Sequence, residues 1–191
     1  RSEPFKLRKQ VLLHEWTENS KPLEELLAGF DRQDQINLIQ NFLDTPRYRE
    51  LVLKNKSGLP SLIVKTRSNK KVRAMLAQSF APKYLEQIEK ILDATDLSDE
   101  AAFAIVKNIK AAFSESNISH VVKVLEPAQG TSVEIWLKTS LLEQYAANIH
   151  SDVALGRALA KSLISENKAV KDFGEQLLAM AEDPKLKRFK I

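Results

Sequence analysis

The stretch SDEAAFAIVKNIKAAF, residues 98–113, decides the fold class because it carries a complete helix signal. Ser98 is a residue type that caps helix N-termini, and the two acids after it suit the positive end of a helix. The apolar residues that follow, among them Phe103 and Ile109, recur three and four positions apart, which places side chains on one face of a helix. We therefore predict a helix that begins after Ser98 and buries one side.

The same kind of start recurs along the whole chain. A capping residue or a Pro precedes apolar residues at helical spacing often enough to predict about eleven helices. They are expected to begin near Ser2, Ser20, Asp31, Thr45, Ser68, Pro82, Ser98, Ile118, Thr131, Asp152 and Lys168. Only the short apolar piece at residues 62–64 leaves a strand open as an alternative.

Four local features add detail to this pattern. Thr45 is expected to cap a helix whose first position is Pro46, where the missing amide costs nothing. Gly58 is expected to take a positive φ in the turn at residues 55–58, and Pro127 is expected to end the helix before it. The run Thr-Ser-Val-Glu at residues 131–134 has the spacing of a capping box.

An all-α protein is the fold class that this pattern predicts, because no convincing alternating strand occurs and short loops join antiparallel neighbours. Two arrangements satisfy it: an α-solenoid-like stack of helix hairpins and an irregular bundle. The short helices favour the stack. We expect residues 1–184 to form a single helical domain, with a subdivision near residues 94–98 as an alternative, followed by a basic tail at residues 185–191.

One segment resembles a known repeat. The run NKSGLPSL at residues 55–62, followed by VRAML at residues 72–76, resembles a degenerate ankyrin repeat, in which a turn Gly precedes Thr-Pro-Leu-His and a second helix. The sequence departs from that pattern because Pro60 lies one place early, no His follows Leu62, and the second run comes one residue too soon. The resemblance covers residues 55–76. It implies a turn, two short helices and a protein-binding scaffold of the helical-repeat kind.

The sequence contains no pattern typical of catalysis or metal binding. It has no Cys, and its three histidines, His14, His120 and His150, lie far apart and outside any metal-ligand spacing. It has neither a Gly-x-Ser-x-Gly motif nor a phosphate-binding Gly loop. We therefore expect no enzyme, no cofactor and no metal. No apolar run approaches the roughly 18 residues of a membrane helix, so no transmembrane segment is predicted.

Charge is the feature that stands out. From residue 47 to residue 83 the chain carries ten basic residues and one acid, a net charge of +9, which leaves −5 elsewhere in a chain of net charge +4. A field of this polarity attracts anionic partners. The residues that we predict to bind such a partner are Arg47, Arg49, Lys54, Lys65, Arg67, Lys70, Lys71 and Arg73.

These observations favour a non-enzymatic protein–protein interaction module, a helical-repeat scaffold or adaptor whose basic first half engages an acidic protein partner. Binding of nucleic acid, in particular RNA, by residues 47–83 is the alternative, since the same charges would contact phosphates. A membrane surface is not favoured, because the apolar side of the segment at residues 68–80 is better explained as core. A cytoplasmic location is expected, with export left open by the absence of Cys.

Overall fold

The structure is a computed structural model that describes residues 3–114 and 116–182. Within these ranges the chain forms twelve α-helices and one 3₁₀ turn, with no β-strand. The all-α prediction is thereby confirmed, with one helix more than expected because residues 59–65 are helical and not extended. The tail at residues 185–191 lies outside the described residues. Contacts between Cα atoms divide the chain into two compact units, residues 1–85 (unit 1) and residues 86–191 (unit 2).

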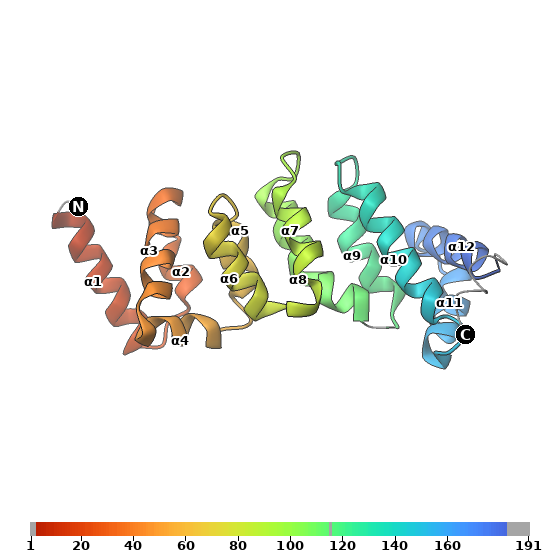
Figure 1. The fold of residues 1–191 in the computed structure, drawn as a ribbon, viewed down its shortest axis with the longest axis horizontal. Helices are drawn as coiled ribbons and strands as arrows, with labels where there is room; N and C mark the ends of the chain where they lie inside the picture. Colours follow the sequence, from red (N-terminus) through yellow and green to blue (C-terminus); the bar gives the residue numbers. More distant parts are fainter. Residues whose placement is uncertain (1–2, 115, 183–191) are drawn as a thin grey trace. The chain divides into compact units, whose positions relative to one another are not determined.

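Unit 1 contains six helices and the 3₁₀ turn, which are drawn from red to yellow in Figure 1. Its elements are α1 (Glu3–Thr17), α2 (Leu23–Leu27), α3 (Arg32–Asp44), α4 (Pro46–Lys54), α5 (Leu59–Lys65), α6 (Lys70–Phe80) and η1 (Pro82–Tyr84). Its core includes a cluster of three aromatic rings in which Phe42 lies 5.1 Å from Trp16 and 5.8 Å from Tyr48, measured between ring centroids. Helices α5 and α6 pack together as a hairpin.

Unit 2 begins at the end of η1. Its elements are α7 (Leu85–Asp93), α8 (Asp99–Ser114), α9 (Ile118–Ala128), α10 (Glu134–Asn148), α11 (Val153–Leu163) and α12 (Lys168–Glu182). Helices α8 and α9 pack together, as do α11 and α12 (Figure 1). Phe173 of α12 is fully buried in an edge-to-face contact with Tyr145 of α10, with 5.8 Å between their ring centroids. Whether the two units fold as one cooperative domain stays a prediction.

The helix starts follow the predicted residue types in some places and not in others. Ser98 accepts a hydrogen bond from the Ala101 amide at 3.1 Å, as a cap should. The Thr45 prediction was half right: Pro46 does begin α4, but the Thr45 hydroxyl donates to the Asn41 carbonyl and caps nothing. Pro127 does not end α9, which continues to Ala128.

The capping box predicted at residues 131–134 was wrong. The Thr131 hydroxyl donates backwards to the Ala128 carbonyl at 2.6 Å, and the Glu134 carboxylate accepts from the Gly130 amide at 2.8 Å. The Ser132 amide and hydroxyl both donate to the Asp96 carboxylate, at 2.6 and 2.7 Å. The two bonds from Ser132 lower the pKa of Asp96.

The prediction of a positive φ at Gly58 was also wrong, since its φ is −90°. A Cβ at this position would meet the ends of two side chains, the Glu24 carboxylate and the Asn55 amide, the latter at 2.7 Å, so both would have to shift for a larger residue. The Asn55 amide donates to the same Glu24 oxygen at 2.7 Å. Gly58 thus lets α2 and the turn before α5 approach each other.

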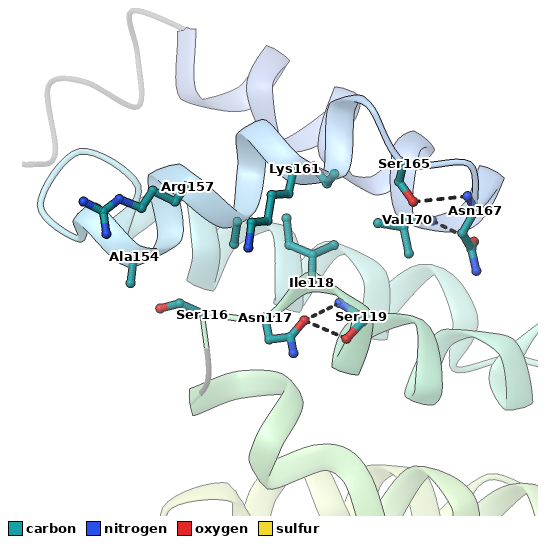
Figure 2. A pocket seen from close by; sticks show the side chains of 12 residues that line it. Ser116, Asn117, Ile118, Ser119, Ala154, Arg157, Lys161, Ser165, Asn167 and Val170 are labelled. Carbon is teal, nitrogen blue, oxygen red and sulfur yellow. Dashed lines mark hydrogen bonds between the residues drawn. The ribbon is translucent and has the colours of Figure 1, made fainter.

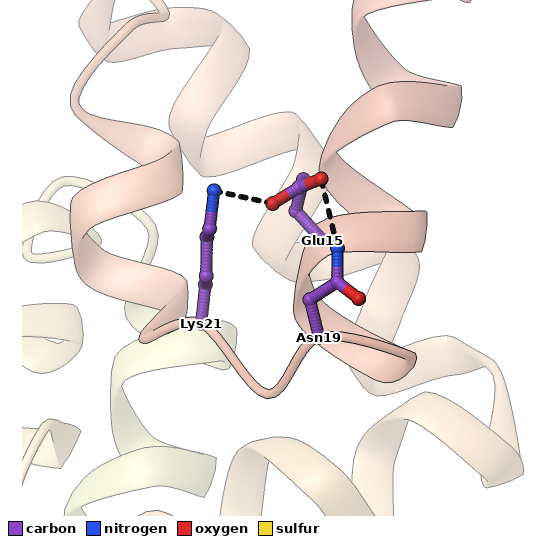
Figure 3. Close-up of polar contacts among 3 residues, drawn as sticks. All are labelled: Glu15, Asn19 and Lys21. Atoms are coloured by element: carbon purple, nitrogen blue, oxygen red, sulfur yellow. Dashed lines mark hydrogen bonds and ion pairs between the residues drawn. The ribbon is translucent and has the colours of Figure 1, made fainter.

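The connection between α1 and α2 uses a polar cluster where a Ser cap was expected. Ser20 takes a φ of 53°, so it does not cap α2, which begins at Leu23 after Pro22. Instead, the Glu15 carboxylate accepts from the Asn19 amide at 3.0 Å and pairs with the Lys21 ammonium at 2.5 Å (Figure 3). The hydrogen bond from Lys21 is the main cause that lowers the pKa of Glu15.

Candidate functional site

Three of the eight predicted binding residues lie on α4, and we call them the α4 group: Arg47, Arg49 and Lys54. All three are exposed. The Arg47 guanidinium lies 5.5 Å from the centroid of the Tyr48 ring, within cation–π range, and the Arg49 guanidinium donates to the Leu43 carbonyl. Lys54 lies in the last turn of α4 and forms no ion pair with any residue that the structure describes.

Four further residues surround the turn between α5 and α6, and we call them the turn group: Lys65, Arg67, Lys70 and Lys71. Lys70 and Lys71 are exposed, stand in the first turn of α6 and pair with no carboxylate in the described ranges. Asn69 caps this helix by accepting from the Val72 amide at 3.2 Å. Lys65 is half-buried. Burial lowers the pKa of its ammonium, and the nearby Glu24 carboxylate opposes that shift.

Arg73 does not belong to the exposed surface that the sequence suggested. Its side chain is only 4% exposed, and its Nη1 donates to the Arg67 carbonyl at 3.0 Å. The guanidinium thus holds the turn between α5 and α6 against the first turns of α6. It is a structural residue of the turn and offers no surface to a partner.

The structure therefore separates the eight predicted residues into two groups and one buried arginine. The α4 group precedes α5 in the sequence, whereas the turn group begins at Lys65, the last residue of α5, and continues into the first turn of α6. A single continuous basic face is not formed by all eight. The turn group is the more compact, with Arg67, Lys70 and Lys71 inside five residues.

No group of three or more His, Cys, Asp or Glu side chains in residues 3–114 and 116–182 is placed to hold a metal ion. His14 is exposed on α1, and His150 approaches the Ala181 carbonyl at 3.2 Å through its Nε2. None of the helices in the described ranges combines the length and the apolar character needed to cross a membrane.

Sequence reasoning missed a cavity of about 660 Å³ in unit 2. It lies between α11 and the N-terminal ends of α9 and α12, and it includes two basic side chains of α11, Arg157 and Lys161 (Figure 2). Their separation of four residues puts both on one face of the helix, a signal that was present in the sequence. A count of charges does not reveal this pair, because residues 86–191 carry 13 basic and 16 acidic side chains and so have a negative net charge.

Asp152 joins two walls of this cavity. One of its carboxylate oxygens accepts from the Leu155 amide at 3.1 Å and caps α11, while the other accepts from the Ser116 hydroxyl at 2.9 Å. The bond from the Leu155 amide, followed by that from Ser116, lowers the pKa of Asp152. The carboxylate therefore stabilises the fold in its charged form.

We expect Asp152→Asn to reduce the acid sensitivity of the chain. A carboxyl whose folded pKa lies below its unfolded value stabilises the protein above the unfolded pKa of about 3.9, and this contribution is lost as pH falls through the folded pKa. Urea unfolding at pH 7 and pH 3 should show a smaller drop in stability for Asp152→Asn than for the unchanged chain. Asp152→Ala, which also removes the cap, should be the less stable variant at pH 7. Equal drops for the Asp152→Asn variant and the unchanged chain would contradict this assignment.

Comparisons of the chain with models of known families, with curated proteins and with solved structures found no match.

Proposed function

We propose that this chain is a non-enzymatic protein-interaction module, a helical scaffold or adaptor in which the turn group of unit 1 binds an acidic segment of a partner protein. The observation that carries the proposal is the exposure of Lys70 and Lys71 with no carboxylate paired to either in the described ranges. A cytoplasmic location and a basic binding patch belong to the same proposal.

The position of these two lysines has an energetic consequence. The N-terminal end of a helix carries a partial positive charge, so an ammonium in the first turn is unfavourable by about 0.3–1 kcal/mol. The first turn of α6 contains both lysines and no acid. The two lysines therefore destabilise the free protein, and the carboxylates of a partner would offset this unfavourable electrostatic energy. Such a local destabilisation is expected of a binding surface and not of residues selected for stability.

The aromatic residues of the basic stretch favour a protein partner over nucleic acid. Binding of single-stranded RNA draws on exposed aromatic rings on which bases stack. Of the two aromatic residues in the stretch, Tyr48 packs against the rings of Trp16 and Phe42, and Phe80 is half-buried. Tyr84, which follows the stretch, is buried. Nucleic acid remains the alternative occupant, and the experiment below includes it.

The resemblance of residues 55–76 to an ankyrin repeat is part of this proposal. After the turn at residues 55–58, α5 and α6 form a pair of short packed helices. Helix pairs of this kind occur in many helical-repeat proteins, most of which act as binding scaffolds. The pair therefore supports a scaffold without selecting the ankyrin family.

We expect Lys70→Gln/Lys71→Gln to weaken binding and to stabilise the free chain at the same time. Binding to a fluorescent Glu-rich peptide at low salt should weaken by about tenfold, since two charge-assisted contacts are lost. The free energy of unfolding should rise by about 0.5–2 kcal/mol, because the unfavourable charges leave the helix end and Gln matches Lys in helix propensity. Fluorescence anisotropy and urea unfolding measure the two effects.

The matched control is Lys110→Gln/Lys123→Gln, which removes the same charge from exposed positions on α8 and α9 of unit 2. It should change the affinity by less than about twofold if the turn group is the site, because it leaves all the charges of the turn group in place. Equal losses in both variants would show nonspecific attraction. Tighter binding of RNA than of the peptide across a salt series would select the nucleic-acid alternative.

A further inference from the structure

The cavity in unit 2 lies outside the basic stretch that charge counts along the sequence identified. One wall is α11, and the facing wall is the segment at residues 116–119 that begins α9 (Figure 2). Ser165, Asn167 and Val170, where α12 begins, line it further. Its volume of about 660 Å³ falls within the range of ligand-binding clefts in proteins.

The charged side chains that line this cavity are basic, and the nearby Asp152 carboxylate is held by hydrogen bonds between two of its walls. Arg157 and Lys161 are its only charged lining residues within the described ranges, and both are exposed and form no ion pair there. Residues 86–191 as a whole have a net charge of −3, so the cavity is a local basic spot in an acidic unit. This arrangement selects an acidic ligand and directs it to one place on the unit.

Apolar groups lie beside these charges. Ile118 is 3% exposed at the bottom of the cavity, and Val170 lines it where α12 begins. Val153 and Ile164, at the two ends of α11, are 72% and 83% exposed. Large aliphatic side chains left in water beside a cleft are typical of surfaces that bind a protein segment and less so of sites for a small ion.

The spacing of the two cations matches an extended peptide. Arg157 and Lys161 are four residues apart on α11, about 6 Å along the helix axis. In an extended chain, alternate residues point to the same side and lie about 6.7 Å apart. Two acidic side chains at positions i and i+2 would therefore reach the two cations, while the residue between them would face the opposite wall, where Ile118 lies.

We infer that the cavity binds a short extended segment of a partner protein with the pattern acidic–apolar–acidic. The side-chain oxygens of Asn117 and Asn167 accept from the Ser119 and Val170 amides, so the NH2 groups of these two side chains are left to donate to the backbone carbonyls of such a segment. The chain's own residues 185–191 do not fit, because they contain four basic residues and no acid. This site is independent of the turn group, so it can exist whether or not the proposed function of unit 1 is right.

The test uses the full chain and fluorescent ten-residue peptides that carry Asp-Leu-Asp between Gly-Ser flanks. We expect Arg157→Gln/Lys161→Gln to weaken binding of this peptide at least about tenfold. Peptides with Asn-Leu-Asn, Asp-Ser-Asp or Asp-Asp-Leu in its place should bind the unchanged chain more weakly. In nitrogen-15 NMR spectra, the amide signals of Ile118, Ser119 and Val170 should shift on binding.

Two variants with the same loss of charge serve as controls. Lys110→Gln/Lys123→Gln removes charges outside the cavity, and Lys70→Gln/Lys71→Gln removes those of unit 1; each should change the affinity for Asp-Leu-Asp by less than about twofold. A loss confined to Lys70→Gln/Lys71→Gln, or equal binding of Asp-Asp-Leu and Asp-Leu-Asp, would overturn the inference. So would full competition by inorganic phosphate at the same concentration as the peptide, which would show an anion site with no preference for a segment.

Discussion

Replacing Phe42 by Ala is expected to be among the most damaging single changes in unit 1, with a loss of about 3–5 kcal/mol in the free energy of unfolding. The Phe42 side chain is fully buried on α3 and lies against the rings of Trp16 on α1 and Tyr48 on α4. Its removal takes away the buried ring and leaves a cavity at the point where three helices meet. The surrounding backbone is helical, so collapse around the cavity should be incomplete.

Trp fluorescence measures this effect, because the chain has two tryptophans and each unit contains one. Urea unfolding followed in a Trp136→Phe background reports unit 1 through Trp16, and the converse Trp16→Phe background reports unit 2. We expect Phe42→Ala to lower the Trp16 midpoint strongly. A parallel shift of the Trp136 midpoint would show that the two units unfold as one domain, as the sequence predicted.

The control for Phe42→Ala is Leu7→Ala on α1, where the side chain is 62% exposed. Loss of an exposed side chain should cost less than about 0.5 kcal/mol. A loss at Phe42 no greater than that at Leu7 would contradict the packing of unit 1 described above.

The fold class could be predicted from sequence because its determinants are local. Apolar spacing and Pro or acidic residues near helix starts act within one or two turns, and Ser98 shows that a local cap can be identified correctly. The wrong predictions at Thr131 and Gly58 show where local sequence patterns fail. The Thr131 hydroxyl binds the Ala128 carbonyl and does not cap. Beside it, Ser132 is held by the Asp96 carboxylate, 36 residues away, and Gly58 lies against the Glu24 side chain of another helix. Contacts of that range leave no local pattern.

The candidate site was predictable in composition and not in arrangement. Counting charges identified the basic stretch, but it treated Arg73 like its neighbours, although α6 turns that side chain inward to the Arg67 carbonyl. Helical spacing from the buried Val72 and Leu76 could have signalled this. The cavity of unit 2 was missed because a charge count over residues 86–191 gives a negative sum. The acids in that range outnumber the bases, so the count does not show that Arg157 and Lys161 lie together in a cavity.

The second large effect is expected at Gly174, where α12 approaches α11. A Cβ at this position would collide with the Ser162 hydroxyl and would lie 2.9 Å from the Ser162 Cβ, which is closer than two such atoms pack. Ser162 is 2% exposed and its hydroxyl donates to the Leu159 carbonyl at 2.6 Å, so rotation away from the clash breaks a buried hydrogen bond. We expect Gly174→Ala to destabilise unit 2 by about 1–3 kcal/mol, despite the better helix propensity of Ala.

Gly156 on α11 provides the matched control, because a Cβ there would meet nothing within 4 Å. Gly156→Ala should therefore stabilise unit 2 by about 0.5–1 kcal/mol through propensity alone. Urea unfolding followed at Trp136 should give opposite signs for the two Gly→Ala changes. Ser162→Gly removes the atoms that a Cβ at position 174 would meet, so the double variant Gly174→Ala/Ser162→Gly should lose less than the sum of its single changes. If the losses in the free energy of unfolding are additive, the destabilisation by Gly174→Ala arises within α12. The close approach of α11 and α12 would then not be its cause.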